Sequence, residues 1–208
     1  SLPDFHGARF DAFMTFNGSL CYTEDTVIYR NPIPTEDVHI IIKNAADIHR
    51  QVSIATAERM SANGKDQDLI DYYAISKQEV KVSEDFTLLA QQEVYQIMMG
   101  CYPSEYPMVM RDVRHAKIAA WWDRAVDIIP ASGGKGIGVQ KILEHFHLSP
   151  DEAAAFGDGD NDIEMLQAVG TGIAMANASA NLKQAADVLC KDVREDGVYM
   201  YCKENGLI

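Results

Sequence analysis

Apolar residues recur with two different spacings along the chain, and the change between them divides the sequence into two regions. In the first region, the short apolar run Ala12–Phe16 is stopped by Asn17-Gly18, a pair typical of turns. Strand-like runs and helical patterns follow, and one predicted helix begins at Thr35 with its apolar residues on a single face. These apolar residues are Val38, Ile41, Ile42, Ala45 and Ile48. Residues 20–127 are therefore predicted to form an α+β unit with antiparallel strand pairs.

Beyond Pro130 the pattern becomes more regular. Strand-like runs at 153–156 and 172–175 alternate with helical patterns at 136–147 and 162–168, and short Gly or Asn turns separate them. Such alternation is typical of a parallel sheet with helices packed on its faces. The second region is therefore predicted to be α/β.

An acidic loop follows the strand-like run at 153–156. Its sequence is Gly157-Asp158-Gly159-Asp160-Asn161-Asp162. Carboxylates this close together repel one another unless a cation neutralises them, and hard oxygen ligands suit Mg²⁺. We interpret the loop as half of a Mg²⁺ and phosphate site. The alternative is an acidic helix N-terminus whose side chains cap free amides. An EF-hand calcium loop is excluded, because Ile163 and Val169 occupy positions that need Gly and Glu.

A glycine-rich segment that contains Lys135 precedes the helix at 136–147. Its glycines would let backbone amides approach an anion, and the lysine supplies a compact cation for a phosphate oxygen. The segment is not a Walker A loop, because Gly136 stands where Ser or Thr is required. The alternative is a flexible linker with a solvated lysine. The acidic loop about twenty residues later favours a phosphate site.

Composition narrows the classes of partner. The net charge of −13 argues against nucleic-acid or anionic-membrane partners, which need a basic face. It also requires any phosphate site to supply its own positive charge. The cysteines show no metal or redox spacing, and neither a signal peptide nor a membrane-length apolar run is present. We expect a cytoplasmic protein with reduced thiols.

The lysine segment and the acidic loop together resemble the last two motifs of the haloacid dehalogenase superfamily, most closely its Cof-type sugar-phosphatase branch. Phe16–Gly18, Gly172–Asn177 and Glu195–Tyr199 also resemble that branch. The resemblance implies a doubly wound parallel (Rossmann-like) α/β core, incomplete at its N-terminus, with an inserted α+β cap domain. The expected division is core at 1–19, cap at 20–127 and core at 128–208.

The resemblance also implies roles for individual residues. Lys135 would neutralise the phosphate and steady the nucleophile, so it counts as both catalytic and substrate-binding. Asp158 would bind Mg²⁺ directly. Asn161 would hydrogen-bond the phosphoryl oxygens. Asp162 is expected to be catalytic and to serve the metal, through a metal-bound water or by orienting Lys135.

Two further residues of these motifs are expected to have lesser roles. Asp160 is expected to be solvated and structural. Asn17 is expected to shape the entrance to the site and to contact substrate, and its alternative role is that of a simple turn residue.

One departure from the resemblance concerns the family's first motif, Asp-x-Asp-Gly-Thr, which supplies the nucleophile and the acid/base. No such motif occurs in the sequence, nor does the second, phosphate-binding Ser or Thr motif. We expect a truncated form with little or no activity. The missing first strand would leave unpaired sheet edges, closed either by direct pairing of the flanking strands or by self-association.

The expected function is therefore Mg²⁺-dependent hydrolysis of small phosphorylated metabolites such as sugar phosphates, through an aspartyl-phosphate in the intact family. A non-catalytic Mg²⁺- or phosphometabolite-binding protein and a phosphomutase are the alternatives. The cap would select the substrate. Three pairs could line its pocket, although such pairs are more typical of a core. These pairs are Trp121-Trp122, Tyr72-Tyr73 and Met98-Met99.

Overall fold

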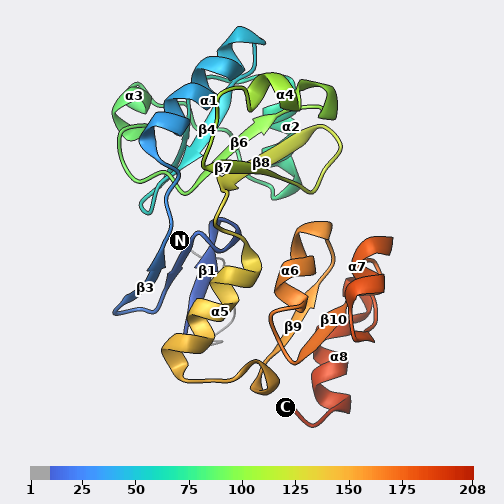
Figure 1. The fold of residues 1–208 in the computed structure, drawn as a ribbon. Helices are drawn as coiled ribbons and strands as arrows, with labels where there is room; N and C mark the ends of the chain where they lie inside the picture. The colour runs from blue at the N-terminus through green and yellow to red at the C-terminus, as the bar shows by residue number, and fades with distance from the viewer. Residues whose placement is uncertain (1–9) are drawn as a thin grey trace.

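The computed structural model describes residues 10–208, and two connections join its two lobes (Figure 1). The upper lobe, the cap, contains a five-stranded antiparallel sheet in the order β5-β4-β6-β8-β7. Its strands are β4 (Val52–Ala55), β5 (Met60–Ala62), β6 (Gln96–Gly100), β7 (Ala116–Ala120) and β8 (Ala125–Pro130). Its helices are α1 (Thr35–Asp47), α2 (Gln67–Ile75), α3 (Phe86–Leu89) and α4 (Tyr106–Val109).

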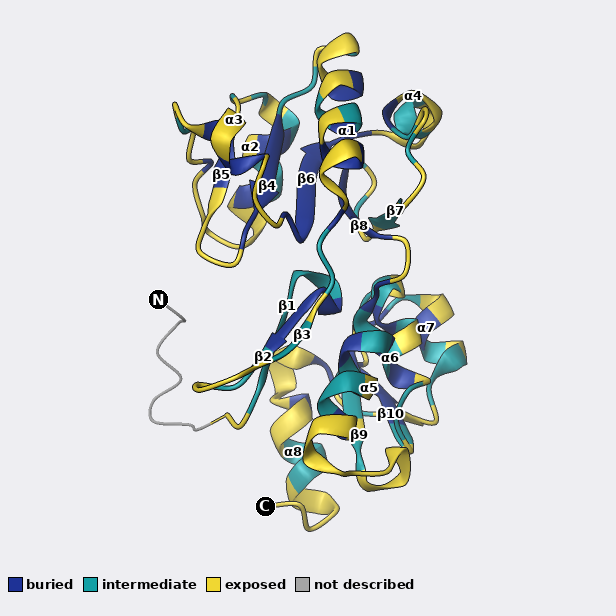
Figure 2. Cartoon of the chain, turned by 60° about the vertical axis from the view of Figure 1, so that its left-hand side comes forward, coloured by how far each residue is buried: buried dark blue, intermediate teal, exposed yellow. Residues whose placement is uncertain are grey.

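The cap sheet is buried on both faces, as the dark central strands of Figure 2 show. Side chains alternate across a strand, so neighbours in β6 enter different clusters. Ile97 and Met99 pack with the apolar face of α1, whereas Met98 packs with Leu69 of α2 on the other face. The predicted one-sided apolar pattern of the helix that begins at Thr35 is confirmed.

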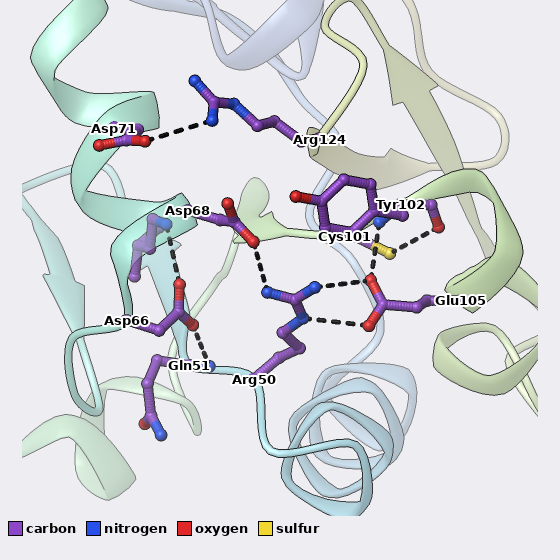
Figure 3. A network of polar contacts seen from close by, with 10 residues as sticks. Arg50, Gln51, Asp66, Asp68, Asp71, Cys101, Tyr102, Glu105 and Arg124 are labelled. Carbon is purple, nitrogen blue, oxygen red and sulfur yellow. Dashed lines mark hydrogen bonds and ion pairs between the residues drawn. The ribbon is translucent and has the colours of Figure 1, made fainter.

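A polar network fixes the edge of the cap (Figure 3). Arg50 follows α1, and its guanidinium pairs with Asp68 at 2.6 Å and with Glu105 at 3.0 Å. Asp66 caps α2 by accepting a hydrogen bond from the Leu69 amide, at 2.9 Å. The network therefore connects the end of α1, the start of α2 and the segment before α4.

The lower lobe, the core, contains two separate three-stranded sheets. The first is antiparallel, with β1 (Phe13–Thr15), β2 (Leu20–Tyr22) and β3 (Val27–Arg30). The second is parallel in the order β11-β10-β9, with β9 (Ala154–Gly157), β10 (Thr171–Ala174) and β11 (Val188–Leu189). The helices are α5 (Lys135–Phe146), α6 (Ile163–Leu166), α7 (Ala180–Ala185) and α8 (Gly197–Glu204). The predicted parallel arrangement of the second region is confirmed.

The strand pairing differs from the expected cap boundary at residue 20. β2 and β3 form a hairpin, but they pair with β1 of the core and not with the cap sheet. Only the short turn Phe16–Gly18 and Ser19 separate β1 from β2, and so short a connection allows only antiparallel pairing. At the other boundary, β8 continues to Pro130, three residues beyond the expected end at 127.

The expectation that the flanking strands might close the gap by pairing directly is wrong for the described residues. β1 and β9 belong to different sheets, and neither pairs with the other. α5 contacts both β1–β3 and α6, so the two sheets are joined through helices. No helix within residues 10–208 is long and apolar enough to cross a bilayer.

Candidate active site between the two lobes

A cavity of about 470 Å³ lies between the cap and the core. All five residues that the sequence singled out for the site line it: Asn17, Lys135, Asp158, Asn161 and Asp162. The cap contributes the remaining polar and aromatic wall, formed by Tyr72, Trp121 and Asp127. Two turns more than twenty residues apart in the chain therefore converge, together with the turn that contains Asn17.

Lys135 and Asp162 form an ion pair at the floor of the cavity. Lys135 is the first residue of α5, whereas Asp162 ends the acidic loop immediately before α6. The second oxygen of Asp162 accepts hydrogen bonds from the backbone amides of Asp158 and Gly159, at 3.0 and 3.2 Å. Asp162 is only 5% exposed, so this carboxylate both holds the loop and orients the lysine.

The turn Phe16–Gly18 brings Asn17 into the same cavity. All three residues have positive φ values, which is costly for Phe16 and more readily tolerated by Asn17. Contacts with the cap compensate for this cost, because the Phe16 ring stacks on Tyr95 with centroids 6.0 Å apart. A Cβ at Gly18 would lie 2.4 Å from the carbonyl oxygen of Gly134, so glycine allows the turn to contact the lysine segment.

Asn17 links the acidic loop to the cap. Its amide oxygen accepts a hydrogen bond from the Asn161 side chain at 3.2 Å. Its amide nitrogen donates to Gln96 at 2.9 Å and to Asp127 at 2.8 Å. A single side chain thus connects a core residue with two cap strands, which is more than the turn role that the sequence left open.

Asp127 and Gln96 were not predicted from the sequence. Asp127 is 5% exposed in the middle of β8 and also accepts a hydrogen bond from the Tyr72 hydroxyl at 2.7 Å. Burial raises the pKa of the Asp127 carboxyl, while the hydrogen bonds from Tyr72 and Asn17 act in the opposite direction. The available signal was a single carboxylate within an otherwise apolar run, Ala125–Ile129. A charged residue is buried in such a position only when it has partners.

The aromatic and methionine pairs divide between cavity and core. Tyr72 and Trp121 line the cavity, and their rings meet edge to face at 5.3 Å. Tyr73 and Met98 instead belong to the buried cluster beneath α2. Burial raises the pKa of the Tyr72 hydroxyl, so this group remains a hydrogen-bond donor toward Asp127.

The other two carboxylates of the acidic loop have different surroundings. The Asp160 oxygens accept hydrogen bonds from Ser179 and from Asn181, the latter at 3.0 Å, and these bonds lower the pKa of Asp160. Such contacts fit a structural role. Asp158 accepts one hydrogen bond, from the Asn177 side chain at 3.3 Å, and lines the cavity. Its remaining acceptor positions are therefore available to a ligand.

The donor set fits a cation that completes its coordination with other groups. Within residues 10–208, no group of three or more His, Cys, Asp or Glu side chains is arranged to hold a metal ion. Mg²⁺, however, is commonly bound by one or two carboxylates together with waters and substrate phosphate. The cavity walls carry three carboxylates (Asp127, Asp158 and Asp162) against one ammonium group, that of Lys135. This excess of negative charge favours a bound cation.

Comparison with known proteins identifies the family. The model of haloacid dehalogenase-like hydrolases matches residues 4–201. The chain belongs to this family. It is 30% identical over 198 residues to a putative phosphatase, YkrA, of Bacillus subtilis (strain 168), covering 95% of this chain and 76% of the relative.

Solved structures agree with this assignment. A subclass IIB sugar phosphatase of the family superimposes with a TM-score of 0.85 at 26% identity, covering 96% of this chain and 77% of that chain. A second structure, from a study of a trigonal-bipyramidal intermediate in a phosphoryl-transfer superfamily, gives a TM-score of 0.87 at 26% identity, with the same coverage. The predicted fold class, a Rossmann-like α/β core with a cap, is confirmed, and family membership supports phosphatase activity.

Proposed function

We propose that the cavity binds Mg²⁺ and the phosphate group of a small phosphorylated metabolite, as in a sugar phosphatase. The observation that carries the proposal is the convergence of Lys135, Asp158, Asn161 and Asp162 on one cavity. Its volume of about 470 Å³ suits a small metabolite. The phosphatase and sugar-phosphatase names of similar proteins support the same reaction class.

Each residue has a distinct part in this proposal. The Lys135 ammonium, positioned by Asp162, neutralises phosphoryl oxygens. The Asn161 amide donates a hydrogen bond to one of those oxygens when substrate displaces its contact with Asn17. Asp158 would hold Mg²⁺, with Asp162 acting behind it through its bond to Lys135. When bound, Mg²⁺ would supply further neutralisation of phosphate charge.

The described residues provide binding groups but no evident nucleophile, which favours slow turnover or none. Covalent phosphoryl transfer needs a carboxylate aimed at phosphorus. Both oxygens of Asp127 and of Asp162 already accept hydrogen bonds or pair with Lys135. Asp158 is assigned to the cation. This observation favours a second candidate function, binding of Mg²⁺ and a phosphorylated metabolite without hydrolysis.

Two measurements on the same chain test these functions. Titration calorimetry with inorganic phosphate in the presence of Mg²⁺ should show binding that Lys135→Met weakens strongly. Hydrolysis of p-nitrophenyl phosphate with Mg²⁺ should then be slow or absent. Absence of phosphate binding would refute both functions, and turnover at ordinary phosphatase rates would refute the binding-only function.

We further propose a cytoplasmic location, because all four cysteines are free. We also propose that the chain self-associates through its unpaired sheet edges. Within residues 10–208, β9 and β1 each have a strand partner on one side only. Nucleic acid and membranes are not expected partners, given the net charge of −13.

A further inference from the structure

Among the described residues that line the cavity, Asp127 is the only carboxylate from the cap. The other two, Asp158 and Asp162, belong to the core loop that would bind cation and phosphate. Asp127 lies on β8, an inner strand of the cap sheet between β6 and β7, and is almost fully buried. It therefore faces the part of the cavity left for the remainder of the substrate, the leaving group.

Two donors hold the Asp127 carboxylate in place without using all of its acceptor capacity. Tyr72 donates to one oxygen at 2.7 Å and Asn17 donates to the other at 2.8 Å. A carboxylate can accept about four hydrogen bonds, so the group retains acceptor capacity even though the Trp121 side chain also contributes to it. Burial raises the pKa of this carboxyl, whereas the hydrogen bonds to its oxygens and the nearby Lys135 charge favour the ionised form. Above that raised pKa, the group is a fixed, negatively charged acceptor.

Lys135 is the only cation among the described cavity-lining residues, and it acts on the Asp127 charge through space rather than as an ion-pair partner. Lys135 lines the cavity but pairs with Asp162. The nearest basic groups of the β7–β8 region are also engaged elsewhere. Lys117 pairs with Glu164 at 3.8 Å, and Arg124 pairs with Asp71 at 3.5 Å while lying over the Trp122 ring.

The distance across the cavity suits a small substrate. The Asn17 amide contacts Asn161 with its oxygen and Asp127 with its nitrogen. The phosphate-side Asn161 and the cap-side Asp127 are therefore separated by about one amide group. The ring of Trp121, 36% exposed, forms an apolar wall beside them. An atom of the leaving group only a few covalent bonds from the phosphate would therefore contact Asp127.

We propose that Asp127 is a specificity-determining residue of this site: it accepts hydrogen bonds from hydroxyl groups of the leaving group and excludes phosphorylated carboxylic acids. The inference rests on the proposed function, because it assumes that phosphate binds at Lys135 and Asn161. A carboxylate on the leaving group would meet a negative charge that has no ion-pair partner among the described residues, whereas a hydroxyl or an ammonium group would meet an acceptor.

Three size-matched ligands separate these possibilities on the full chain. They are 2-hydroxyethyl phosphate, phosphoethanolamine and phosphoglycolate, which carry the same phosphate and differ at the far end. Affinities would be measured by titration calorimetry at about pH 8 with Mg²⁺, using inorganic phosphate as the reference ligand. The hydroxyl and amine compounds should bind at least about ten-fold more tightly than phosphoglycolate, as expected for close like charges in a partly buried site.

Asp127→Asn tests the residue itself, because it removes the charge and keeps the shape. The preference against phosphoglycolate should fall by about ten-fold in this variant. Asp123→Asn is the matched control: it removes one charge from the exposed β7–β8 turn, outside the cavity. If general repulsion by the acidic chain disfavours phosphoglycolate, both substitutions should reduce that preference equally. If Asp127 is responsible, only Asp127→Asn should reduce it. Asp127→Ser provides a second variant if the amide does not fold.

The possible outcomes are distinguishable. If inorganic phosphate and all three esters fail to bind, the proposed phosphate site is wrong. The role of Asp127, which depends on that site, is then wrong as well. If the esters bind but the parent chain does not disfavour phosphoglycolate, only the role of Asp127 is overturned. The role of Asp127 is also overturned if the preference against phosphoglycolate persists in the Asp127 variants. The ranking on the parent chain is a test that needs no variant.

Discussion

At the scale of single residues, Lys135 is the group on which phosphate binding most depends. Lys135→Met should weaken phosphate binding at least about ten-fold, because it removes the only cation lining the described cavity. It should also lower the free energy of unfolding by roughly 2–4 kcal/mol, since it leaves the buried Asp162 carboxylate without its ion-pair partner. Calorimetry and urea unfolding measure the two effects. Lys141→Met, at a half-buried position of the same helix outside the cavity, should change the phosphate affinity and the stability much less.

The carboxyl of Asp127 should make stability depend on pH in a definite direction. Burial raises its folded-state pKa above the ordinary value of 3.8, so the folded state binds the proton more tightly. Its contribution to stability is then full below pH 3.8 and is lost as pH rises through the raised pKa. Urea unfolding between about pH 4 and pH 8 should show Asp127→Asn gaining stability relative to the parent as pH rises. A relative gain that shrinks with rising pH would contradict the assignment, and Asp123→Asn serves as the reference.

At the scale of elements, the turn between β1 and β2 is held by one glycine. Gly18→Ala should destabilise the fold by roughly 2 kcal/mol or more, because φ is +85° and the new Cβ would lie 2.4 Å from the Gly134 carbonyl oxygen. Gly206→Ala is the matched control. Its φ is also positive, +68°, but no atom lies within 4 Å of the added Cβ. Urea unfolding should show that the control lowers the free energy of unfolding by about 1 kcal/mol. Equal losses of stability in the two variants would show that the contact of Gly18 with the lysine segment does not matter.

The sequence allowed prediction of the helices and strands that depend on local residue spacing. It did not allow prediction of features that depend on contacts with distant segments. Helix α1 and the alternation of strands and helices after Pro130 follow from spacing alone. Helix α4 ends at Val109 and Asp112 follows at a φ of +65°. Distant Asn44 donates hydrogen bonds there to the carbonyls of Val109 and Arg111. Strands β2 and β3 form a hairpin whose sheet could not be predicted, since pairing with β1 depends on contacts between segments.

At the scale of the whole molecule, the same distinction applies to the site. Its core half consists of two short motifs, Lys135 in its glycine-rich segment and the loop 157–162, and each could be recognised in the sequence. Its cap half is assembled from three separate elements: Tyr72 on α2, Gln96 on β6 and Asp127 on β8. No short pattern connects these residues. They meet only because the antiparallel cap sheet places β6 beside β8, with Met98 opposite Asp127 in the register.

The division of the core into two sheets predicts association of the whole molecule. β9 is paired only with β10, which leaves the backbone groups of its other edge without a strand partner among the described residues. Unpaired edges of this kind template pairing with another chain. Analytical ultracentrifugation should therefore show concentration-dependent self-association.

Ala154→Lys, at an exposed position of β9, should shift the equilibrium toward monomer, because a lysine on an edge strand opposes edge-to-edge pairing. Ala120→Lys is the matched control, at an exposed position of the cap edge strand β7, and should leave association through β9 unchanged. A parent chain that remains monomeric at high concentration would mean that the helices of the core shield this edge. An effect of equal size in both variants would mean that added positive charge, rather than the edge, controls association.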